Sequence, residues 1–354
     1  MPASAEQYIH DLCERLMDPV FAGFIDAPAS TRKEILDYGD AHAAQWGYSL
    51  DSESLSRFRG VLENRHALAE YYQEEIAAPL RRAALSHLGE DAEPVRNIPV
   101  GLLPLLTFDA CAGIAPSGEK FIALDFGLGM CCTFLMELFG KLRTWGSDWA
   151  HDPGHSAEEY AAGIASLAYF SVTGSRDALL VALRLHDPAA THAKGYAASG
   201  LVARTWVLLH EYQHILLGHL DHAEVAHLDL SADEQIPIMS YQHSLEMAAD
   251  RAALLTFISH ARASLSAYSF VESLGPLLRF MRLREVVRSL LRPAPPHPSH
   301  PGAEERWRAA LAVFVAEFPE TEGLADWSCG LLDGSFDAIE KDVRTQLYRS
   351  QTGG

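Results

Sequence analysis

The sequence predicts an α+β fold that is mostly helical and has one small sheet. Three observations support this prediction. Segments with helical spacing of apolar residues dominate the chain. Two short apolar runs flank the turn Pro116–Ser117–Gly118, which indicates a β-hairpin. The composition, 48% hydrophobic and 21% charged, is that of a folded globular protein.

The first part of the chain is predicted to be helical throughout. Residues 4–90 read as helices, Thr31 and Glu34 have the spacing of a capping box, and segment 52–88 is long, charged and amphipathic. We therefore interpret 1–95 as an N-terminal helical region and 96–354 as a core with C-terminal helices. We expect the two to form one compact unit, since 354 residues allow one large domain.

The remaining elements follow in order. After the hairpin in 97–127, a helix runs to about Leu142, and Ser156 with Glu159 begins another helical region. Residues 200–220 form a strongly apolar helix and 240–262 an alanine-rich one. The proline-dense segment 293–302 excludes regular helix, which resumes near Ala303.

Charge and composition exclude several classes of partner and location. The 28 Lys and Arg against 47 Asp and Glu give a net charge of -19, which argues against nucleic acid or an anionic membrane surface as a partner. No uncharged apolar run reaches membrane-spanning length, and the N-terminus does not resemble a signal peptide. Five cysteines without a disulfide pattern are typical of reduced thiols, so we expect a cytoplasmic protein without membrane insertion.

The segment 206–220, WVLLHEYQHILLGHL, contains an HExxH pattern formed by His210, Glu211 and His214. On a helix, residues four apart lie on one face, so both imidazoles can bind one zinc ion from the same side. Glu211 is adjacent to the pair and can act as a general base on water. The apolar flanks favour a buried helix.

A third zinc ligand can be sought by its spacing from the motif. The metzincin pattern requires Gly and His where this chain has Leu217 and Leu220, so that pattern is absent. Several other candidates follow closely, but they lie at or beyond the end of the helix: His219, Asp221, His222 and His227.

The stronger candidate for the third ligand is on the next helix, YQHSLEMAADRAA. Glu246 and Asp250 are four residues apart there, among alanines that permit close packing. Glu246 would complete a His-His-Glu site with a fourth position for water. Asp250 could accept a hydrogen bond from a zinc-binding histidine and fix its tautomer. The alternative is an exposed face with both carboxylates in solvent.

HExxH followed by ExxxD on a second helix resembles the gluzincin zinc peptidases. HEYQHILLGHL with LEMAAD is similar to the CAAX-protease and heat-shock membrane peptidase family and its soluble relatives. That family has an S/T-H-P motif followed by E-R, which Ser299–His300–Pro301 and Glu305–Arg306 match. The resemblance implies a zincin-like core, with His300 stabilising the oxyanion and Arg306 bracing the site.

The resemblance also extends to GEKFIALDFGL at 118–128, which is similar to the strand before the active-site helix. It implies an edge strand that could pair with an extended substrate. The chain departs from the family in lacking the membrane-spanning helices, and the stretch between this strand and the active-site helix looks inserted. The phage-exclusion peptidases of the Lit type also resemble this chain, through the zinc motif alone.

These observations predict a zinc endopeptidase acting on a protein or peptide substrate. Zinc would bind His210, His214 and Glu246, with Glu211 as general base. A non-catalytic binding protein with structural zinc is the alternative, favoured if a fourth side chain such as His219 or His227 closes the site. The arginine-rich helix 279–292 could bind nucleic acid, but the preferred interpretation is pairing with the protein's own carboxylates. The sequence leaves the oligomeric state open.

Overall fold

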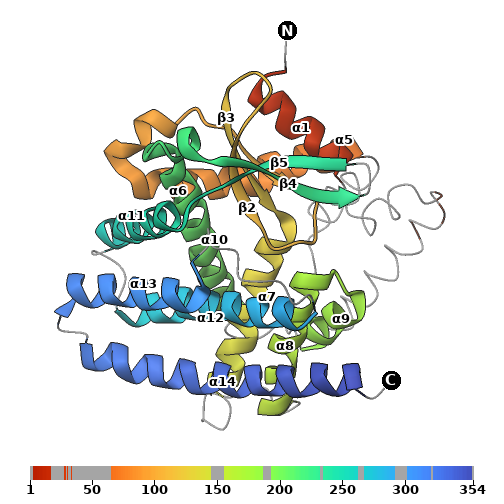
Figure 1. Ribbon diagram of the computed structural model, residues 1–354, viewed down its shortest axis with the longest axis vertical. Coiled ribbons are helices and arrows are strands. Elements are labelled where there is room, and N and C mark those ends of the chain that lie inside the picture. The colour runs from red at the N-terminus through yellow and green to blue at the C-terminus, as the bar shows by residue number, and fades with distance from the viewer. Residues whose placement is uncertain are drawn as a thin grey trace.

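The computed structural model describes residues 3–16, 65–144, 155–185, 193–231, 234–261, 267–291, 301–319 and 322–352, with the single positions 28, 30 and 33. Over these residues the fold is mostly helical, with a three-stranded and a two-stranded sheet (Figure 1). This confirms the predicted α+β class. The predicted capping box at Thr31 and Glu34 lies outside the described residues. Among the described helices, none has both the length and the apolar character needed to cross a bilayer.

The described part of the N-terminal region is helical. Its elements are α1 (Ala5–Arg15), α5 (Arg65–Tyr71), the π-helix η1 (Tyr72–Ala77), α6 (Ala78–Leu88) and the 3₁₀ helix η2 (Gly89–Val95). Residues from α5 to η2 belong to the same buried core cluster as the later helices. The segments before and after residue 95 therefore share one hydrophobic core. A domain boundary at residue 95 stays a prediction.

The three-stranded sheet contains β1 (Val100–Leu103), β2 (Ala110–Ile114) and β3 (Lys120–Asp125), in the order β1-β3-β2. The predicted hairpin is present, since β2 pairs antiparallel with β3, and Gly118 in the turn has a φ of 87°. Strand β1 runs parallel to β3. The prediction of an edge strand at 118–128 was wrong, because β3 is hydrogen-bonded on both sides and has no free edge for a substrate.

The outer edge of β1 is covered by side chains. The carbonyl of Leu102 accepts hydrogen bonds from Cys13 Sγ at 3.1 Å and from Gln73 Nε2 at 3.4 Å. Cys13 is on α1 and Gln73 is on η1, so both helices lie against this strand. An ideal Cβ at Gly101 would lie 2.0 Å from Ile9 Cγ2, which shows how closely α1 packs there.

Helices form most of the remaining structure. Their bounds are α7 (Phe126–Thr144), α8 (Ala157–Thr173), α9 (Arg176–Arg184), α10 (Ala193–Leu216), the 3₁₀ helix η3 (His219–His222), α11 (His243–Ala261), α12 (Ala267–Leu291), α13 (Ala303–Glu317) and α14 (Glu322–Thr352). The predicted capping box of Ser156 and Glu159 is formed at the start of α8. Between η3 and α11, β4 (Glu224–Ser231) pairs antiparallel with β5 (Glu234–Ser240).

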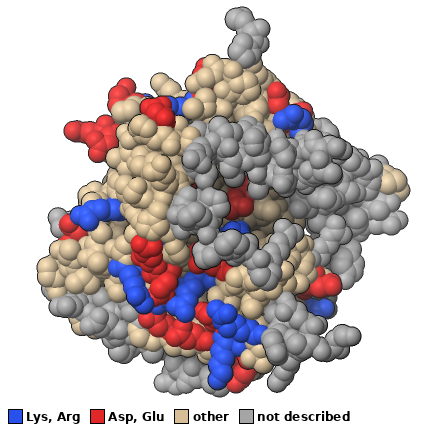
Figure 2. Space-filling view, viewed as in Figure 1, with Lys and Arg blue, Asp and Glu red and all other residues tan. Residues whose placement is uncertain are grey.

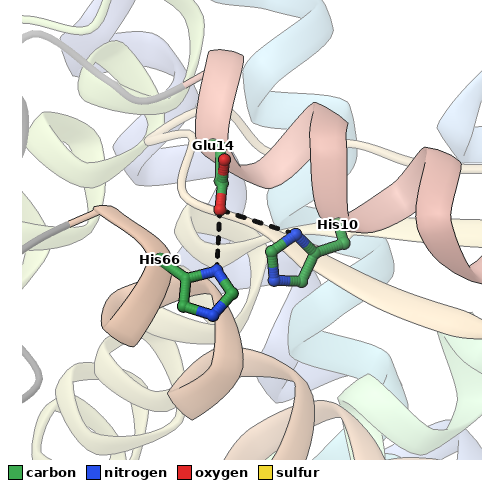
Figure 3. A group of neighbouring side chains, drawn as sticks. All are labelled: His10, Glu14 and His66. Carbon is green, nitrogen blue, oxygen red and sulfur yellow. Dashed lines mark hydrogen bonds and ion pairs between the residues drawn. The ribbon is translucent and has the colours of Figure 1, made fainter.

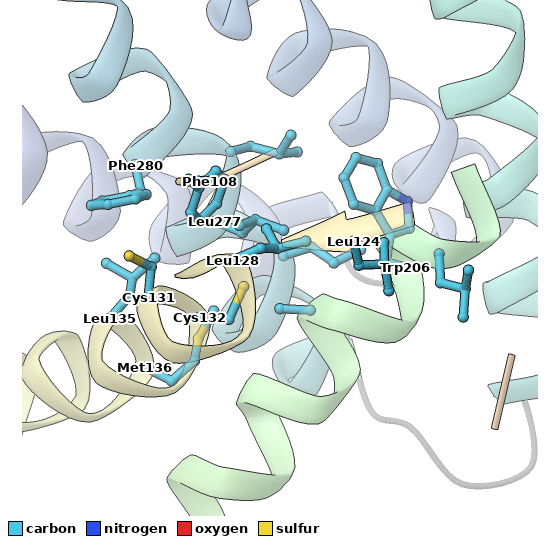
Figure 4. Packing of buried hydrophobic residues seen from close by; sticks show 14 of the residues in the cluster. Phe108, Leu124, Leu128, Cys131, Cys132, Leu135, Met136, Trp206, Leu277 and Phe280 are labelled. Carbon is cyan, nitrogen blue, oxygen red and sulfur yellow. The ribbon is translucent and has the colours of Figure 1, made fainter. Parts of the chain in front are cut away.

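The main core lies where α7, α10 and α12 meet the inner face of the sheet. Cys131 and Cys132 on α7 are fully buried beside Leu128 and Leu135, as predicted for an apolar helix (Figure 4). Phe280 on α12 packs against Phe108, with ring centroids 5.5 Å apart. Helix α10 contacts α6, α7, α11, α12 and β2 (Figure 1). The buried face of α10 is therefore surrounded by several other elements.

Three arginines of α12 have partners within the molecule. Arg279 forms ion pairs with Glu304 and Asp333, and Arg282 hydrogen-bonds Glu304 at 2.7 Å and Glu340 at 3.0 Å. Arg284 instead donates to Ser171 Oγ at 2.9 Å. Figure 2 shows acidic and basic side chains intermixed on one face of the molecule. The contacts of Arg279 and Arg282 match the interpretation that these arginines pair with the protein's own carboxylates.

Candidate metal centre

Helix α10 holds the HExxH residues inside the molecule. Leu208, Leu209 and Tyr212 have no exposed surface, so the helix is fixed by burial on several sides. The two histidines, four residues apart, project from one face of the helix. His210 is 6% exposed and His214 has no exposed surface. Polar groups buried this deeply are costly unless they have partners.

Helix α11 supplies those partners. It packs directly against α10, and the fully buried Ala249 and Ala253 permit the close approach that its alanines predicted. Glu246 and Asp250 are 7% and 8% exposed, so the alternative of solvent-exposed carboxylates is wrong. Both side chains face His210 across the helix interface.

Three ligand atoms converge between the two helices. His210 Nε2 lies 3.1 Å from His214 Nε2 and 3.3 Å from Glu246 Oε2. His214 Nε2 lies 3.8 Å from Glu246 Oε1. A tetrahedral zinc ion with bonds of about 2.05 Å separates its ligand atoms by about 3.3 Å. The observed spacings are close to that value.

A chain of charged groups lies behind His210. Its Nδ1 is 2.8 Å from Asp250 Oδ1, and Arg306 on α13 donates to both oxygens of Asp250 at 2.6 Å. The Arg306 guanidinium also lies 5.9 Å from the ring of Trp206. Arg306 therefore contacts Asp250, which in turn contacts His210, and its bracing role stays a prediction. A carboxylate on the far nitrogen of a metal-binding histidine fixes its orientation and tautomer.

The far side of His214 has different neighbours. Its Nδ1 lies 3.0 Å from His219 Nδ1, and its ring stacks on Tyr241 at a centroid distance of 3.7 Å. His219 therefore contacts the nitrogen of His214 that faces away from Glu246. His219 does not join the three converging ligand atoms.

Glu211 is buried beside the histidine pair and is 6% exposed. Burial and the nearby Glu246 raise its pKa to about 7, against the opposing charge of His210. The backbone of Ala112, on the outer edge of β2, hydrogen-bonds the Glu211 carboxylate. Glu211 can therefore both accept and release a proton near neutral pH.

The ligand residues are electrostatically coupled. Burial opposes charge on His210, but Asp250 and Glu246 raise the pKa of its imidazole to about 10. Burial also opposes charge on Glu246, but His210 lowers its pKa to about 2. His214 has a pKa lowered to about 3 by burial and by the charge of His210, so it is neutral at physiological pH.

This donor set fits a divalent metal ion. Two imidazole nitrogens and one carboxylate oxygen are the protein ligands of many catalytic zinc sites. The buried carboxylates Glu246 and Asp250 hold a proton on His210, and a divalent cation could replace that proton as the positive charge among them. His214 is already neutral, so it need not lose a proton before one of its ring nitrogens binds the ion.

The other sequence candidates lie elsewhere. Asp221 and His222 are exposed on η3, and the side chain of His227 is not among those described. His300 lies outside the described residues, so its predicted role stays a prediction. The residues that the sequence analysis missed are Tyr241 and the backbone of Ala112. No motif marks either one, since both reach the site through tertiary packing.

Comparisons with protein-family models, with curated proteins and with solved structures gave no match.

Proposed function

We propose that the protein is a zinc-dependent endopeptidase of the gluzincin type that hydrolyses a protein or peptide substrate. The observation that carries the proposal is the convergence of His210, His214 and Glu246 beside the buried Glu211. In this proposal the helices α10 and α11 form a zincin-like core, as the resemblance of their motifs to the gluzincins implies.

Each residue has a distinct role in the proposed reaction. When bound, zinc would supply a Lewis acid that polarises the substrate carbonyl and acidifies water. His210, His214 and Glu246 would hold the ion, while Asp250 and Arg306 keep His210 oriented. Glu211, with a pKa near neutrality, would take a proton from water and pass it to the leaving amine.

A cytoplasmic location is part of the proposal. Four cysteines are free among the described residues: Cys13, Cys111, Cys131 and Cys132. Burial raises the pKa of the Cys13 thiol to about 12, which keeps it protonated. Unpaired, unreactive thiols are compatible with a reducing compartment.

The second candidate function is a binding protein with a structural metal ion. The observation in its favour is burial, since the three ligand residues and Glu211 are all less than 9% exposed. Structural zinc sites are closed, whereas catalytic sites keep one position open to water. Measuring the role of Glu211 separates the two functions, because a structural site has no use for a general base.

The test replaces Glu211 with Gln, which is similar in shape but cannot accept a proton. We expect Glu211→Gln to retain bound zinc, measured by elemental analysis, and to lose cleavage of proteins in a cell extract by at least about 100-fold. The matched control is Glu93→Gln, which changes an exposed carboxylate that pairs with Arg96 on the surface. It should leave both zinc content and cleavage unchanged.

Each outcome decides between the two functions. If Glu211→Gln binds zinc and still cleaves proteins as fast as wild type, Glu211 is not the general base and the proposed peptidase mechanism is wrong. Zinc bound by wild type without cleavage of any protein in the extract would support the structural site. Absence of zinc from the wild-type protein after growth with added zinc would exclude both.

A further inference from the structure

A second group of metal-ligating side chains lies on the surface, between α1 and α5. His10 and Glu14 are one turn apart on α1, and His66 is on α5 (Figure 3). Glu14 Oε1 lies 2.9 Å from His66 Nδ1 and 3.6 Å from His10 Nδ1. The two imidazole rings are 4.9 Å apart. One ligand atom from each residue falls within 4.8 Å of the other two.

This cluster contains more metal-ligating side chains than an ordinary His–Glu ion pair. A His–Glu pair needs one imidazole, and His155 with Glu159 at 3.6 Å is such a pair elsewhere in the chain. Here two imidazoles from separate helices point at one carboxylate oxygen (Figure 3). The distances of 2.9 and 3.6 Å lie on either side of the ligand spacing of about 3.3 Å around a tetrahedral zinc ion.

The second ring nitrogen of His66, Nε2, also has a carboxylate partner. His66 Nε2 lies 3.2 Å from Glu70 Oε1, one turn further along α5. If Nδ1 binds a metal, Nε2 must carry the proton, and Glu70 is placed to accept its hydrogen bond. A carboxylate behind a histidine is the arrangement that accompanies metal-binding histidines in proteins. Asp250 has the same relation to His210 in the buried site.

We propose that His10, Glu14 and His66 bind a divalent transition-metal ion, such as Zn²⁺, that joins α1 to α5. Imidazole and carboxylate ligands suit zinc, nickel and copper ions. The side chains of His10, Glu14 and His66 are 25%, 37% and 60% exposed, so water completes the coordination and the ion exchanges with solution. This site is independent of the proposed peptidase function.

The ion would stabilise the packing of the first helix. Helix α1 buries Ile9, Leu12 and Cys13 in a small cluster with β1, β3 and Ala69 of α5. The two helices are separated in the sequence by residues 17–64, so an ion bound to both would link segments that are distant along the chain. A metal bound to both helices binds the folded state and not the separated helices, and it therefore raises stability.

The test compares metal content in the full-length protein. We expect wild type to bind one Zn²⁺ more per chain than His66→Ala or His10→Ala, measured by equilibrium dialysis and elemental analysis. Added Zn²⁺ should raise the melting temperature of wild type more than that of either variant. His155→Ala, which breaks an isolated His–Glu pair, should behave as wild type in both measurements.

The test compares the zinc content of wild type with that of each surface variant, so zinc bound at the buried site contributes equally to both and cancels. If that site binds no zinc, wild type should still bind one ion more than the two surface variants. Equal zinc content in wild type, His10→Ala and His66→Ala would overturn the proposal. Cu²⁺ added to the protein provides a second measurement, because the difference between the electron paramagnetic resonance spectra of wild type and His66→Ala should contain a signal with two coordinated imidazole nitrogens. An unchanged Cu²⁺ spectrum in His66→Ala would also overturn it.

Discussion

The two histidines of the buried site differ in the group that contacts the ring nitrogen facing away from Glu246. His210 Nδ1 faces a carboxylate that Arg306 holds in place, whereas His214 Nδ1 faces the neutral ring of His219. A carboxylate increases the basicity of the imidazole more than a neutral acceptor does. We therefore expect His210 to be the more strongly oriented ligand, and its partners to have separable effects.

Asp250→Asn tests the support of His210. The amide cannot accept the Nδ1 proton as strongly, and it removes the negative charge that pairs with Arg306. We expect zinc affinity to fall by about 10- to 100-fold, measured by competition with a chelator. Asp91→Asn, a change at an exposed carboxylate, should leave the affinity unchanged. Equal affinity in Asp250→Asn would show that Asp250 does not orient His210.

His219 offers a second test through two different replacements. Asn can keep an acceptor near the position of His219 Nδ1, whereas Leu removes the acceptor and retains bulk. We expect His219→Leu to weaken zinc binding and His219→Asn to restore part of the loss, since only the acceptor fixes the His214 tautomer. If both variants bind zinc equally well, His219 serves packing alone.

The spacing of residues predicted which side chains lie together between the two helices. Each helix carries two of these side chains four residues apart, and residues at that spacing lie on one face of a helix. The face with His210 and His214 therefore meets the face with Glu246 and Asp250. The contacts of Tyr241 and His219 with His214 could not be predicted from residue spacing. They depend on how η3 and the segment before α11 fold back, and no local periodicity encodes that path.

At the scale of elements, the connection from β3 into α7 depends on a close backbone contact. Gly127 N–H donates to Leu105 O at 2.8 Å. An ideal Cβ at this position would lie 2.2 Å from Thr107 O and 2.5 Å from Leu106 C. Both are backbone atoms, which cannot turn aside as a side chain can. The strand therefore passes into the helix at a point where only glycine fits.

Gly127→Ala should lower the free energy of unfolding by about 1–3 kcal/mol, because the added methyl group forces the 105–107 segment to move. The matched change is Gly330→Ala in the exposed part of α14, where no atom lies within 4 Å of the added carbon. It should raise stability by about 0.5–1 kcal/mol, since alanine favours helix. Urea unfolding measures both. A neutral Gly127→Ala would contradict the close contact.

The elements differ in how much the sequence predicted about them. The helices around α10 and α11 and the β2–β3 hairpin follow from periodicity and turn residues. The parallel pairing of β1 with β3 does not, because it joins segments that are not adjacent in the chain. That pairing makes β3 central, which is why the predicted edge strand was wrong. The β4–β5 hairpin was also not predicted, since 224–240 lacks a glycine turn.

At the scale of the whole molecule, buried charge is balanced between helices. Arg306 on α13 pairs with Asp250 on α11, and Arg279 on α12 pairs with carboxylates on α13 and α14. The net charge of -19 nevertheless leaves an excess of carboxylates. Some of them, such as Glu246, are buried and so favour a bound cation.

Removal of zinc should therefore lower global stability. Helices α10 and α11 would lose the ion that joins His210 and His214 to Glu246. In a His66→Ala background, which excludes the surface cluster, we expect a chelator to lower the melting temperature by several degrees. Combining this background with Glu246→Gln should reduce the effect. An unchanged melting temperature in His66→Ala after verified zinc removal would contradict a metal link between the helices.

The side chains that cap Leu102 have a further consequence for how copies of this protein meet one another. A strand from another molecule could join the sheet at β1 only by displacing the thiol of Cys13 and the amide of Gln73 from that carbonyl. Exposed strand margins act as templates for intermolecular aggregation. Helices α1 and η1 therefore protect the sheet on this flank from growing into a fibrous assembly, and unfolding of α1 would remove that protection.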